Sequence, residues 1–472
     1  MNAPCESRAP VPLKRAIGAA ALGNASEWFD YGIYAYGVSY ISRALFPGDA
    51  LEATLFALAT FAISFLVRPF GGLFWGALGD RFGRKTILAA TILLMSATTV
   101  LVGVIPDYAH IGLWAPALLI VLRMIQGFST GGEYGGAATF MAEYAPDNRR
   151  GFCGSFLEFG TLGGFSLGAL LMLGLSIGLD DAAMQAWGWR IPFLLAAPLG
   201  IAGLYLRARL EDTPVFREID ALDDTQTDTA EATAPIAANL ISLGRDYWKP
   251  LLTLSGLVIA LNVINYTLLS YMPTYFATHM GLSADQALIV PIGGMLFMML
   301  FLPLAGHLSD RIGRKPLWWI SLGGIFLLAL PLYHLMGTGF RGAVAGFAIL
   351  GLLYVPQLAT ISATFPAMFP TPVRFAGFAI AYNVSTSVFG GTAPVVNEWL
   401  IEVTQNPLIP AYLMIGACTI GLIALLFVVE TAGHSLRGTE LPGTEAAQRE
   451  LEALDSDSLT RPATPQTAQE LP

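Results

Sequence analysis

The sequence predicts an all-α integral membrane protein with twelve transmembrane helices in two pseudo-symmetric six-helix bundles. Its composition is the first observation: 54% of the 472 residues are hydrophobic and 12% are charged, whereas soluble domains carry about 25% charged residues. The second is an internal repeat. Residues 76–85 (GALGDRFGRK) and residues 306–315 (GHLSDRIGRK) each lie between a second and a third long apolar segment. Related halves of this kind are typical of membrane proteins that move solutes by alternating access.

Twelve apolar runs supply the predicted spans, each long enough to cross a bilayer. Each run must be helical, because backbone polar groups find no water in the hydrocarbon core. The first six spans are predicted at 16–41, 54–78, 86–105, 113–140, 151–178 and 190–208. The second six are predicted at 250–276, 286–308, 316–336, 341–366, 373–400 and 408–430.

The spans divide the chain into five parts. A short N-terminal segment, residues 1–15, precedes the first bundle, residues 16–209. The linker at 210–248 is rich in Asp, Glu, Thr and Ala and is expected to be flexible. The second bundle, residues 249–431, is followed by a polar tail at 432–472. No heptads are sustained long enough there for a coiled coil.

Lys and Arg predict the orientation, because cytoplasmic loops carry most of these residues. Twenty of the 25 fall in segments that share one side of the membrane, and two lie inside spans. Three lie on the opposite side, namely Arg43, Arg190 and Arg341. Both termini are therefore predicted to be cytoplasmic.

Several function classes are excluded. The net charge of −9 does not indicate nucleic-acid binding, because the acids cluster in the linker and the tail. Cys5, Cys153 and Cys418 lie far apart, with neither metal-ligand spacing nor a disulfide framework. The glycine-rich stretch 131–136 lacks a preceding strand and a P-loop lysine. We therefore expect no enzyme activity, no cofactor, no metal and no use of ATP.

Glycines recur every four residues in two spans and predict close helix packing, since small residues let membrane helices approach one another. They are Gly127, Gly131 and Gly135 in the fourth span, and Gly160, Gly164 and Gly168 in the fifth.

Charged side chains inside a bilayer are costly and usually functional. All those found lie in the first half, so proton coupling is expected there, and no acid was found at comparable depth in the second half. Glu27 and Asp30 are three residues apart and share one helix face. Two close carboxylates in a low-dielectric setting resist joint ionisation, which suits a proton carrier. The alternative is that one of them pairs with an arginine and holds helices together.

The fourth span carries a polar stripe of Arg123, Gln126, Thr130 and Glu133. An arginine near a protonatable carboxylate favours its ionised form and releases it when the pair rearranges. Arg123 is therefore expected to act in proton coupling, or else to form a permanent ion pair. Glu133 is expected to exchange the proton or to accept a hydrogen bond from substrate.

Arg68 precedes Pro69, where the second span is expected to kink. It either faces the carboxylate of a zwitterionic or acidic substrate, or snorkels, or pairs with Glu158. Glu158 lies nearer the cytoplasmic end, so a structural role is expected for it.

Uncharged groups complete the predicted substrate site. Aromatic faces bind quaternary cations well, although aromatic residues at helical spacing more often serve packing. The candidates are Trp28, Tyr31, Tyr34, Gln126, Asn262, Asn265, Tyr266, Gln357 and Asn383, with Phe29 and Tyr271 nearby.

The repeated phrases have a mechanical interpretation. An aspartate at a helix end can cap a neighbouring helix or pair with an arginine, and glycine permits the tight turn. Such a contact would hold the cytoplasmic end closed, although a role in topology alone is the alternative. The predicted gating residues are Gly76, Asp80, Arg81, Gly83, Arg84, Asp310, Arg311, Gly313 and Arg314.

Both phrases resemble the loop motif of the major facilitator superfamily, and the stretch 123–127 (RMIQG) resembles its second motif. The Gly-Pro signature that its antiporters often carry is absent from 160–168, which favours symport or uniport. Further phrases resemble the metabolite:proton symporter branch, in which proline/betaine symporters look most similar. These phrases are EWFDY at 27–31, RPFGG at 68–72, GGEY at 131–134, WGWRIPF at 187–193 and FPAMFP at 365–370.

The resemblance implies a bacterial protein of the cell inner membrane, with lipid, protons and a small solute as its partners. It implies proton-coupled uptake of an osmoprotectant such as proline or glycine betaine. A carboxylate such as citrate or 2-oxoglutarate is the rival substrate, and a transporter-like membrane sensor is the rival class. Some relatives end in a long coiled coil linked to osmotic regulation; residues 438–472 do not supply one.

Overall fold

The computed structural model describes residues 13–82, 84–131, 133–198, 200–201, 243–436, 440–450 and 452. The side chains of 76–77, 79–89 and 133 are not among the described parts. Most of the linker and of the tail lies outside the described residues. Within them the chain is almost wholly helical, without a strand.

The first half contains ten described α-helices. They are α1 (Leu13–Leu45), α2 (Ala50–Leu66), α3 (Arg68–Phe82), α4 (Arg84–Gly103), α5 (Tyr108–Ile111), α6 (Trp114–Thr130), α7 (Glu133–Tyr144), α8 (Arg150–Gly178), α9 (Asp181–Ala186) and α10 (Ile191–Leu194). The second half contains α14 (Trp248–Tyr266), α15 (Met272–Thr278), α16 (Ala284–Ile312), α17 (Arg314–Met336), α18 (Phe340–Thr364), α19 (Arg374–Ser385), α20 (Ala393–Thr404) and α21 (Ile409–Leu426).

Seven helical stretches of the described chain are long and apolar enough to cross a membrane. They coincide with the predicted spans two, five, seven, eight, nine, ten and twelve. Spans one, three, four and eleven are also helical, and span six lies partly outside the described residues. The count of twelve and the side of the termini stay predictions.

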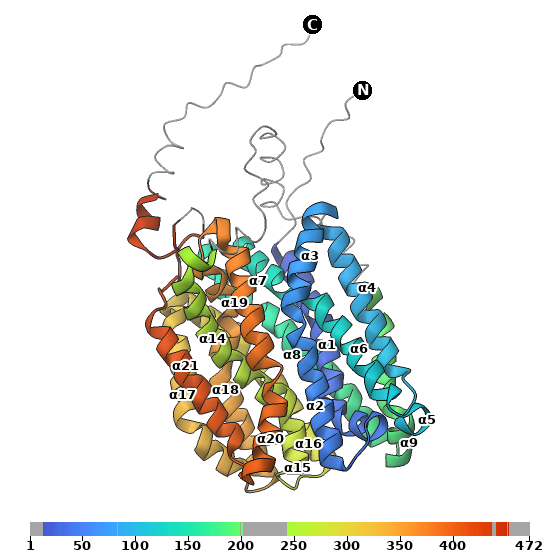
Figure 1. Ribbon diagram of the computed structural model, residues 1–472. Helices are drawn as coiled ribbons and strands as arrows, with labels where there is room; N and C mark the ends of the chain where they lie inside the picture. Colours follow the sequence, from blue (N-terminus) through green and yellow to red (C-terminus); the bar gives the residue numbers. More distant parts are fainter. Residues whose placement is uncertain are drawn as a thin grey trace, which may run out of the picture.

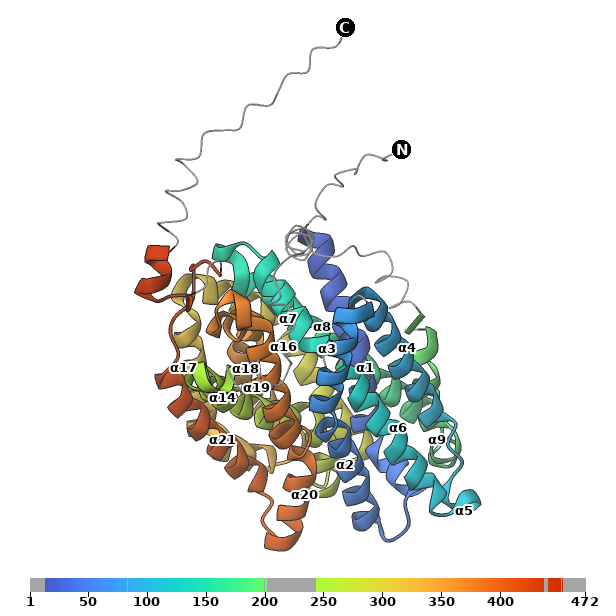
Figure 2. The same cartoon turned by 45° about the horizontal axis from the view of Figure 1, so that its top comes forward.

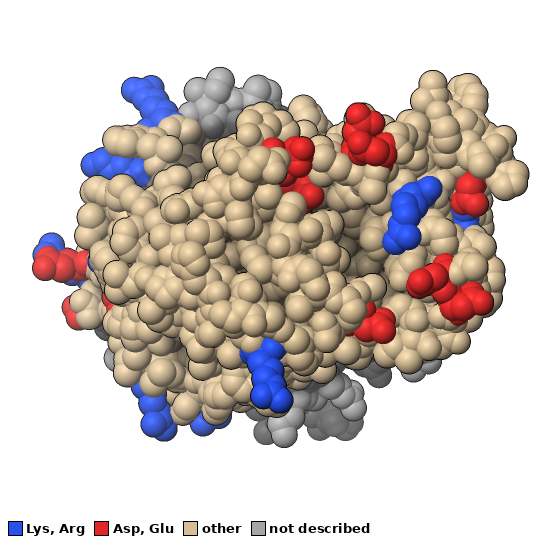
Figure 3. All heavy atoms as spheres, turned by 90° about the horizontal axis from the view of Figure 1, so that it is seen from below, with Lys and Arg blue, Asp and Glu red and all other residues tan. Residues whose placement is uncertain are grey.

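The two halves stand side by side, with α8 and α16 between them (Figures 1 and 2). The start of α1 and residues 440–450 lie at the same end of the molecule, which is the predicted cytoplasmic end (Figure 1). Seen from the opposite end, the surface is mostly uncharged and its Lys and Arg side chains are scattered (Figure 3).

Three helices are interrupted close to a proline, which lacks a backbone N–H and clashes with the preceding turn. Before Pro69, where a kink was predicted, the helix is interrupted at Val67, since α2 ends at Leu66 and α3 begins at Arg68. A π-helical turn, Thr267–Tyr271, precedes Pro273 between α14 and α15. A second π-helical turn, Thr386–Gly390, precedes Pro394 between α19 and α20.

The predicted glycine packing is confirmed in both spans. A Cβ on Gly164 would lie 2.2 Å from the carbonyl oxygen of Ala25 on α1. A Cβ on Gly127 would lie 1.7 Å from the carbonyl oxygen of Ser64 on α2. These backbones touch because no side chain separates them, so α8 packs closely on α1 and α6 packs closely on α2.

Candidate functional site

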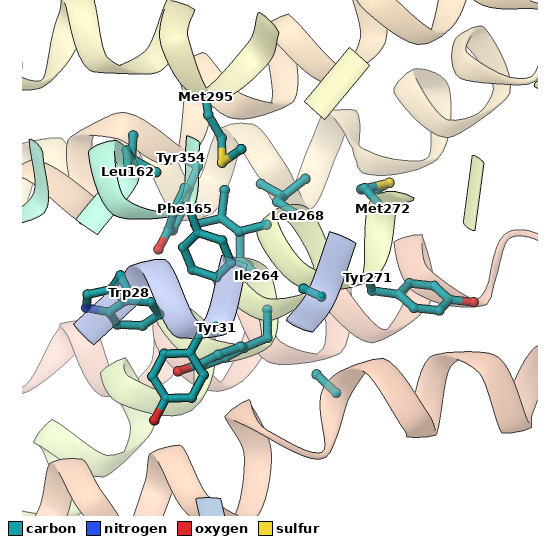
Figure 4. Close-up of a cluster of buried hydrophobic side chains, with 14 of the residues drawn as sticks. Trp28, Tyr31, Leu162, Phe165, Ile264, Leu268, Tyr271, Met272, Met295 and Tyr354 are labelled. Atoms are coloured by element: carbon teal, nitrogen blue, oxygen red, sulfur yellow. The ribbon is translucent and has the colours of Figure 1, made fainter. Parts of the chain in front are cut away.

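An aromatic cluster joins the two halves at the centre of the molecule. We define it as Trp28 and Tyr31 of α1, Phe65 of α2, Phe165 of α8 and Tyr266 of α14. The ring centroids of Phe65 and Tyr266 are 5.0 Å apart, and those of Trp28 and Tyr266 are 6.2 Å apart. Figure 4 shows Trp28, Tyr31 and Phe165 beside side chains of the second half, whereas Tyr271 points away. Aromatic residues from both halves thus meet at one point.

Arg68 lies against this cluster and is the only arginine that contacts it in the described residues. Its Nη2 is 3.0 Å from Oε1 of Glu27 and 2.5 Å from the hydroxyl of Tyr31. Its guanidinium carbon is 4.6 Å from the centroid of Phe65. Arg68 Nε and the Tyr266 hydroxyl are both buried and have no hydrogen-bond partner among the described residues. These two polar groups could therefore form hydrogen bonds with a ligand that enters beside the guanidinium of Arg68.

A second ion pair lies within the first half. Arg123 Nη1 is 3.0 Å from Asp30 Oδ2, and the other carboxylate oxygen accepts from Thr99 at 2.8 Å and from Gln126 at 3.2 Å. The guanidinium carbon of Arg123 lies 3.7 Å from the ring centroid of Tyr34. Asp30 and Arg123 are both almost fully buried, so each is the charged partner of the other inside the first half.

Glu27 and Asp30 share a helix face as predicted, but each binds a different arginine. The predicted alternative of an Arg68–Glu158 pair is wrong, because Arg68 binds Glu27. Glu158 accepts hydrogen bonds from Tyr134 and Thr161 instead. The side chain of Glu133, which was expected to exchange the proton or to accept from substrate, lies outside the described parts.

The remaining candidates divide between the two regions. Gln126 and Tyr34 belong to the Asp30 site, and the Tyr34 hydroxyl donates to the carbonyl of Ala57. Tyr266 lies in the aromatic cluster, with Asn262 one turn before it donating to Thr386. Of the proton candidates, Glu27 is thus held beside the aromatic cluster by Arg68, whereas Asp30 is bound to Arg123, Thr99 and Gln126.

Three polar candidates of the second half make other contacts. Asn265 accepts from the Tyr354 hydroxyl at 3.0 Å. Asn383 donates to the carbonyl of Gly131 in the first half at 2.8 Å. Gln357 was expected to face inward, but its amide donates to Ser321 of α17 at 2.7 Å. Gln357 is thus directed to a neighbouring helix and is not brought to the cluster.

The second repeated phrase links the two halves. Asp310 accepts from the backbone N–H groups of Gly151 and Phe152 at the start of α8. Gly313 has φ 98°, a conformation that favours glycine, so its expected turn role is confirmed. Arg314 Nη1 donates to Thr431, and Arg311 is exposed. The first phrase, with Gly76, Asp80, Arg81, Gly83 and Arg84, falls where side chains are not described.

One buried acid escaped the sequence analysis. Glu398 of α20 is 1% exposed, accepts from the Tyr271 hydroxyl at 2.6 Å, and lies 3.1 Å from Nε2 of His279. The expectation that no acid of the second half lies as deep in the bilayer as Glu27 and Asp30 stays a prediction, because Glu398 lies near the end of the predicted span 373–400. The signal for Glu398 was its position inside that span.

Comparisons with known proteins show the family to which the chain belongs. A model of the family described as sugar (and other) transporter matches residues 16–441. A glycine betaine/proline/ectoine/pipecolic acid transporter of Dickeya dadantii is 44% identical over 429 residues, covering 90% of this chain and 85% of its own length. A proline/betaine transporter of Escherichia coli K12 is similar to the same extent. A putative proline/betaine transporter of Staphylococcus haemolyticus is 41% identical, covering 90% of each chain.

Solved structures show the same fold. A proton:xylose symporter of the major facilitator superfamily, bound to 6-bromo-6-deoxy-D-glucose, superposes with a TM-score of 0.69 at 20% identity, covering 94% of this chain and 98% of its own. A partially occluded, inward-open xylose transporter from Escherichia coli gives a TM-score of 0.68 at 19% identity, covering 89% and 98%.

Proposed function

Because the chain belongs to the sugar (and other) transporter family, we propose that it imports a zwitterionic osmoprotectant, of the proline or glycine betaine type, together with protons. It is a multi-pass membrane transporter and not an enzyme. The predicted bundles at 16–209 and 249–431 would rock against each other. The rival proposal is that the same proton gradient drives the uptake of a carboxylate such as citrate.

The aromatic cluster around a single arginine supports the zwitterion. A guanidinium binds a carboxylate through charge-assisted hydrogen bonds, and aromatic faces attract a quaternary or secondary ammonium. Arg68 lies against the rings of Tyr31 and Phe65 and opposite Tyr266. One ligand can therefore place its carboxylate on Arg68, in exchange for Glu27, and its cation between the rings.

A dianion would need a second cation at the same place. The other intramembrane arginine, Arg123, contacts Asp30 and Tyr34, both of the first half. Arg123 is already paired with the carboxylate of Asp30 and forms no described contact with the aromatic cluster. One positive charge beside an aromatic box, made available when the substrate displaces Glu27, suits a molecule with one carboxylate and one cation better than it suits citrate.

Proton coupling is assigned to the Asp30–Arg123 pair. Protonation of Asp30 would remove the charge that holds Arg123, and the freed hydrogen bonds of Thr99 and Gln126 would allow α1, α4 and α6 to rearrange. Re-ionisation on the other side of the membrane would restore the pair. The two acids of α1 would then have different tasks. Asp30 would carry the proton, and Glu27 would give up Arg68 to the carboxylate of the substrate.

Uptake into proteoliposomes tests this function. Labelled proline, glycine betaine, citrate and 2-oxoglutarate would be offered with and without an inward proton gradient. We expect gradient-driven accumulation of the two zwitterions only. Accumulation of citrate or 2-oxoglutarate alone would overturn the substrate, and counterflow without any accumulation would overturn the coupling. Complete absence of counterflow would favour the sensor class.

A further inference from the structure

The second π-helical turn, Thr386–Gly390, has an outer and an inner face. Val388 and Phe389 are exposed on the outer face, where lipid is expected. Gly390 and the following Gly391 are buried on the inner face. The backbone N–H of Gly391 donates to the carbonyl of the first residue of the turn at 3.2 Å. Such turns are rare and often occur at functional sites, yet the transport steps proposed above do not use this one.

Both glycines lie directly against rings of the aromatic cluster. A Cβ on Gly391 would lie 2.3 Å from Cγ of Phe65, and a Cβ on Gly390 would lie 2.8 Å from Cε2 of Tyr266. Carbon atoms in contact are favourably placed at about 3.5–4.0 Å, so a side chain at either position would displace the ring. The second half thus contacts these two rings with backbone alone.

A side chain of the neighbouring helix holds the turn beside the cluster. Asn262 of α14 lies one turn before Tyr266 and donates to the hydroxyl of Thr386 at 2.9 Å. All three side chains are buried. A buried hydrogen bond is costly to break, because its donor is left without a partner. This bond therefore keeps the backbone of Gly390 and Gly391 close to the rings.

Polar groups without partners accompany this packing. The hydroxyl of Tyr266 and the hydroxyl of Ser387, which belongs to the turn itself, are both buried and have no hydrogen-bond partner among the described residues. The same holds for Nε of Arg68, whose guanidinium carbon lies 4.6 Å from the centroid of Phe65. Buried polar groups are nearly always hydrogen-bonded. Their unpaired state beside the glycines indicates a place where a polar ligand binds.

The position of Phe65 controls the room for a cation in the cluster. Its ring centroid lies 5.2 Å from that of Tyr31 and 5.0 Å from that of Tyr266. A Phe65 ring pushed away from Gly391 would therefore take space inside the cluster. A fully methylated ammonium group is bulkier than a secondary ammonium group, and it binds through contact with aromatic faces. The bulkier cation is thus the one that such a displacement would exclude.

We propose that Gly390 and Gly391 are specificity-determining residues, which keep Tyr266 and Phe65 far enough back for the cluster to accept a fully methylated ammonium group. A residue with a Cβ at either position would select ligands with a smaller cation. The carboxylate of either kind of ligand would still bind Arg68. This inference rests on the proposed uptake of a zwitterion, and it assigns the tolerance for a quaternary ammonium to two residues of the second half.

Gly391→Ala tests the proposal, and Gly416→Ala is the matched control, because a Cβ on Gly416 of α21 meets no atom within 4 Å. The probes are N-methylglycine, N,N-dimethylglycine and glycine betaine, which share one carboxylate and differ by single methyl groups. Each probe would compete with labelled proline for uptake into proteoliposomes. We expect the inhibition constant of glycine betaine to rise about tenfold in Gly391→Ala, the size expected of one overpacked carbon. The constant of N-methylglycine should change little, and the control should match the wild type.

An equal rise for the three probes would overturn the proposal, because the glycines would then serve helix packing alone, and so would an unchanged constant for glycine betaine. If Gly391→Ala folds without transporting, calorimetric titration of the purified protein with the same probes replaces uptake. If it does not fold, Gly390→Ala takes its place, since its Cβ would meet only the edge of the Tyr266 ring and the Asn262 side chain. Failure of both variants to fold would also overturn the proposal. A wild-type protein that transports neither proline nor betaine would instead overturn the proposed function, so the two failures are distinguishable.

Discussion

Asp310 of the second half caps the first turn of α8 in the first half, accepting from the backbone N–H of Gly151 at 2.7 Å and of Phe152 at 2.8 Å. A carboxylate at a helix N-terminus satisfies orphan donors and complements the helix dipole. Because α8 and α16 belong to different halves, this cap links the halves at the end of the molecule that is predicted to be cytoplasmic. Arg374 of α19 and Glu143 of α7 add a second link, at 2.9 Å.

Removing the charge of Asp310 should therefore open this end. Cys153, one turn into α8 and 2% exposed, is a native reporter. In a background with Cys5 and Cys418 replaced by Ser, we expect Asp310→Asn to raise the labelling rate of Cys153 by a membrane-permeant maleimide about tenfold. The estimate follows because a hydrogen bond to a charged group contributes about 1.5–3 kcal/mol, and 1.4 kcal/mol is tenfold.

Asp285 supplies the control for this experiment. It accepts from Ser176 at 3.1 Å, so it joins the same two helices at their opposite ends. Asp285→Asn should leave the labelling rate of Cys153 unchanged or lower it. Equal rates in the wild type and Asp310→Asn would show that the cap does not hold the interface closed.

Substitution of Asp30 should separate exchange from accumulation. Asp30→Asn keeps the hydrogen-bond acceptor for Thr99 and Gln126 but cannot cycle a proton. We expect gradient-driven accumulation to fall to the level of equilibration while counterflow persists. Arg123→Gln should shift the pH dependence of transport, since it removes the cation that stabilises the Asp30 carboxylate. Full uphill accumulation by Asp30→Asn would exclude this residue from coupling.

Substitution of Arg68 tests the substrate carboxylate site. Arg68→Gln should raise the KM for betaine about tenfold or more, because a charge-assisted hydrogen bond contributes about 1.5–3 kcal/mol. Arg68→Lys retains the charge but loses the planar fork, so we expect an intermediate KM. If both variants bind betaine like the wild type, Arg68 serves only to hold Glu27.

Close packing of α8 on α1 predicts contrasting effects for two adjacent glycines. A Cβ on Gly164 would lie 2.2 Å from a backbone oxygen, whereas a Cβ on Gly163 meets only the Met299 side chain at 3.7 Å. Forcing an extra carbon into a packed interface costs about 1–3 kcal/mol. Gly164→Ala should therefore lower the Tm in detergent, and Gly163→Ala should not. Equal Tm values for the two variants would contradict the packing argument.

Some of this architecture follows from sequence because a bilayer permits few solutions. Apolar length fixes the helices, Pro69 fixes the break after α2, and four-residue glycine spacing fixes the contact of α8 with α1. Asp310 caps a helix of the other half, which is one of the two contacts expected of an aspartate at a helix end. These features depend on local chemistry, which a sequence displays directly.

Side-chain partnerships were harder to predict, because they depend on which helices become neighbours. Glu158 was the acid predicted as a possible partner of Arg68, but the packing of the helices places Arg68 against Glu27 of α1 instead. Gln357 carries no sign in its own helix that Ser321 of α17 will be its partner. Glu398 lies near the end of its span, where an acid looks exposed until Tyr271 and His279 cover it.

The contacts of Tyr271 and His279 with Glu398 lead to a last prediction, at the opposite end of the molecule. The Tyr271 hydroxyl donates to buried Glu398, whereas the Tyr275 hydroxyl, one turn later on α15, donates to the carbonyl of Pro407 at 2.7 Å. A hydrogen bond to a charged group contributes about 1.5–3 kcal/mol and a neutral one about 0.5–1.5 kcal/mol. Tyr271→Phe should therefore lower the Tm in detergent more than Tyr275→Phe does. The difference should vanish in a Glu398→Gln background, because there both tyrosines donate to neutral acceptors. A larger loss for Tyr275→Phe in the wild-type background would show that Glu398 is not held as a carboxylate.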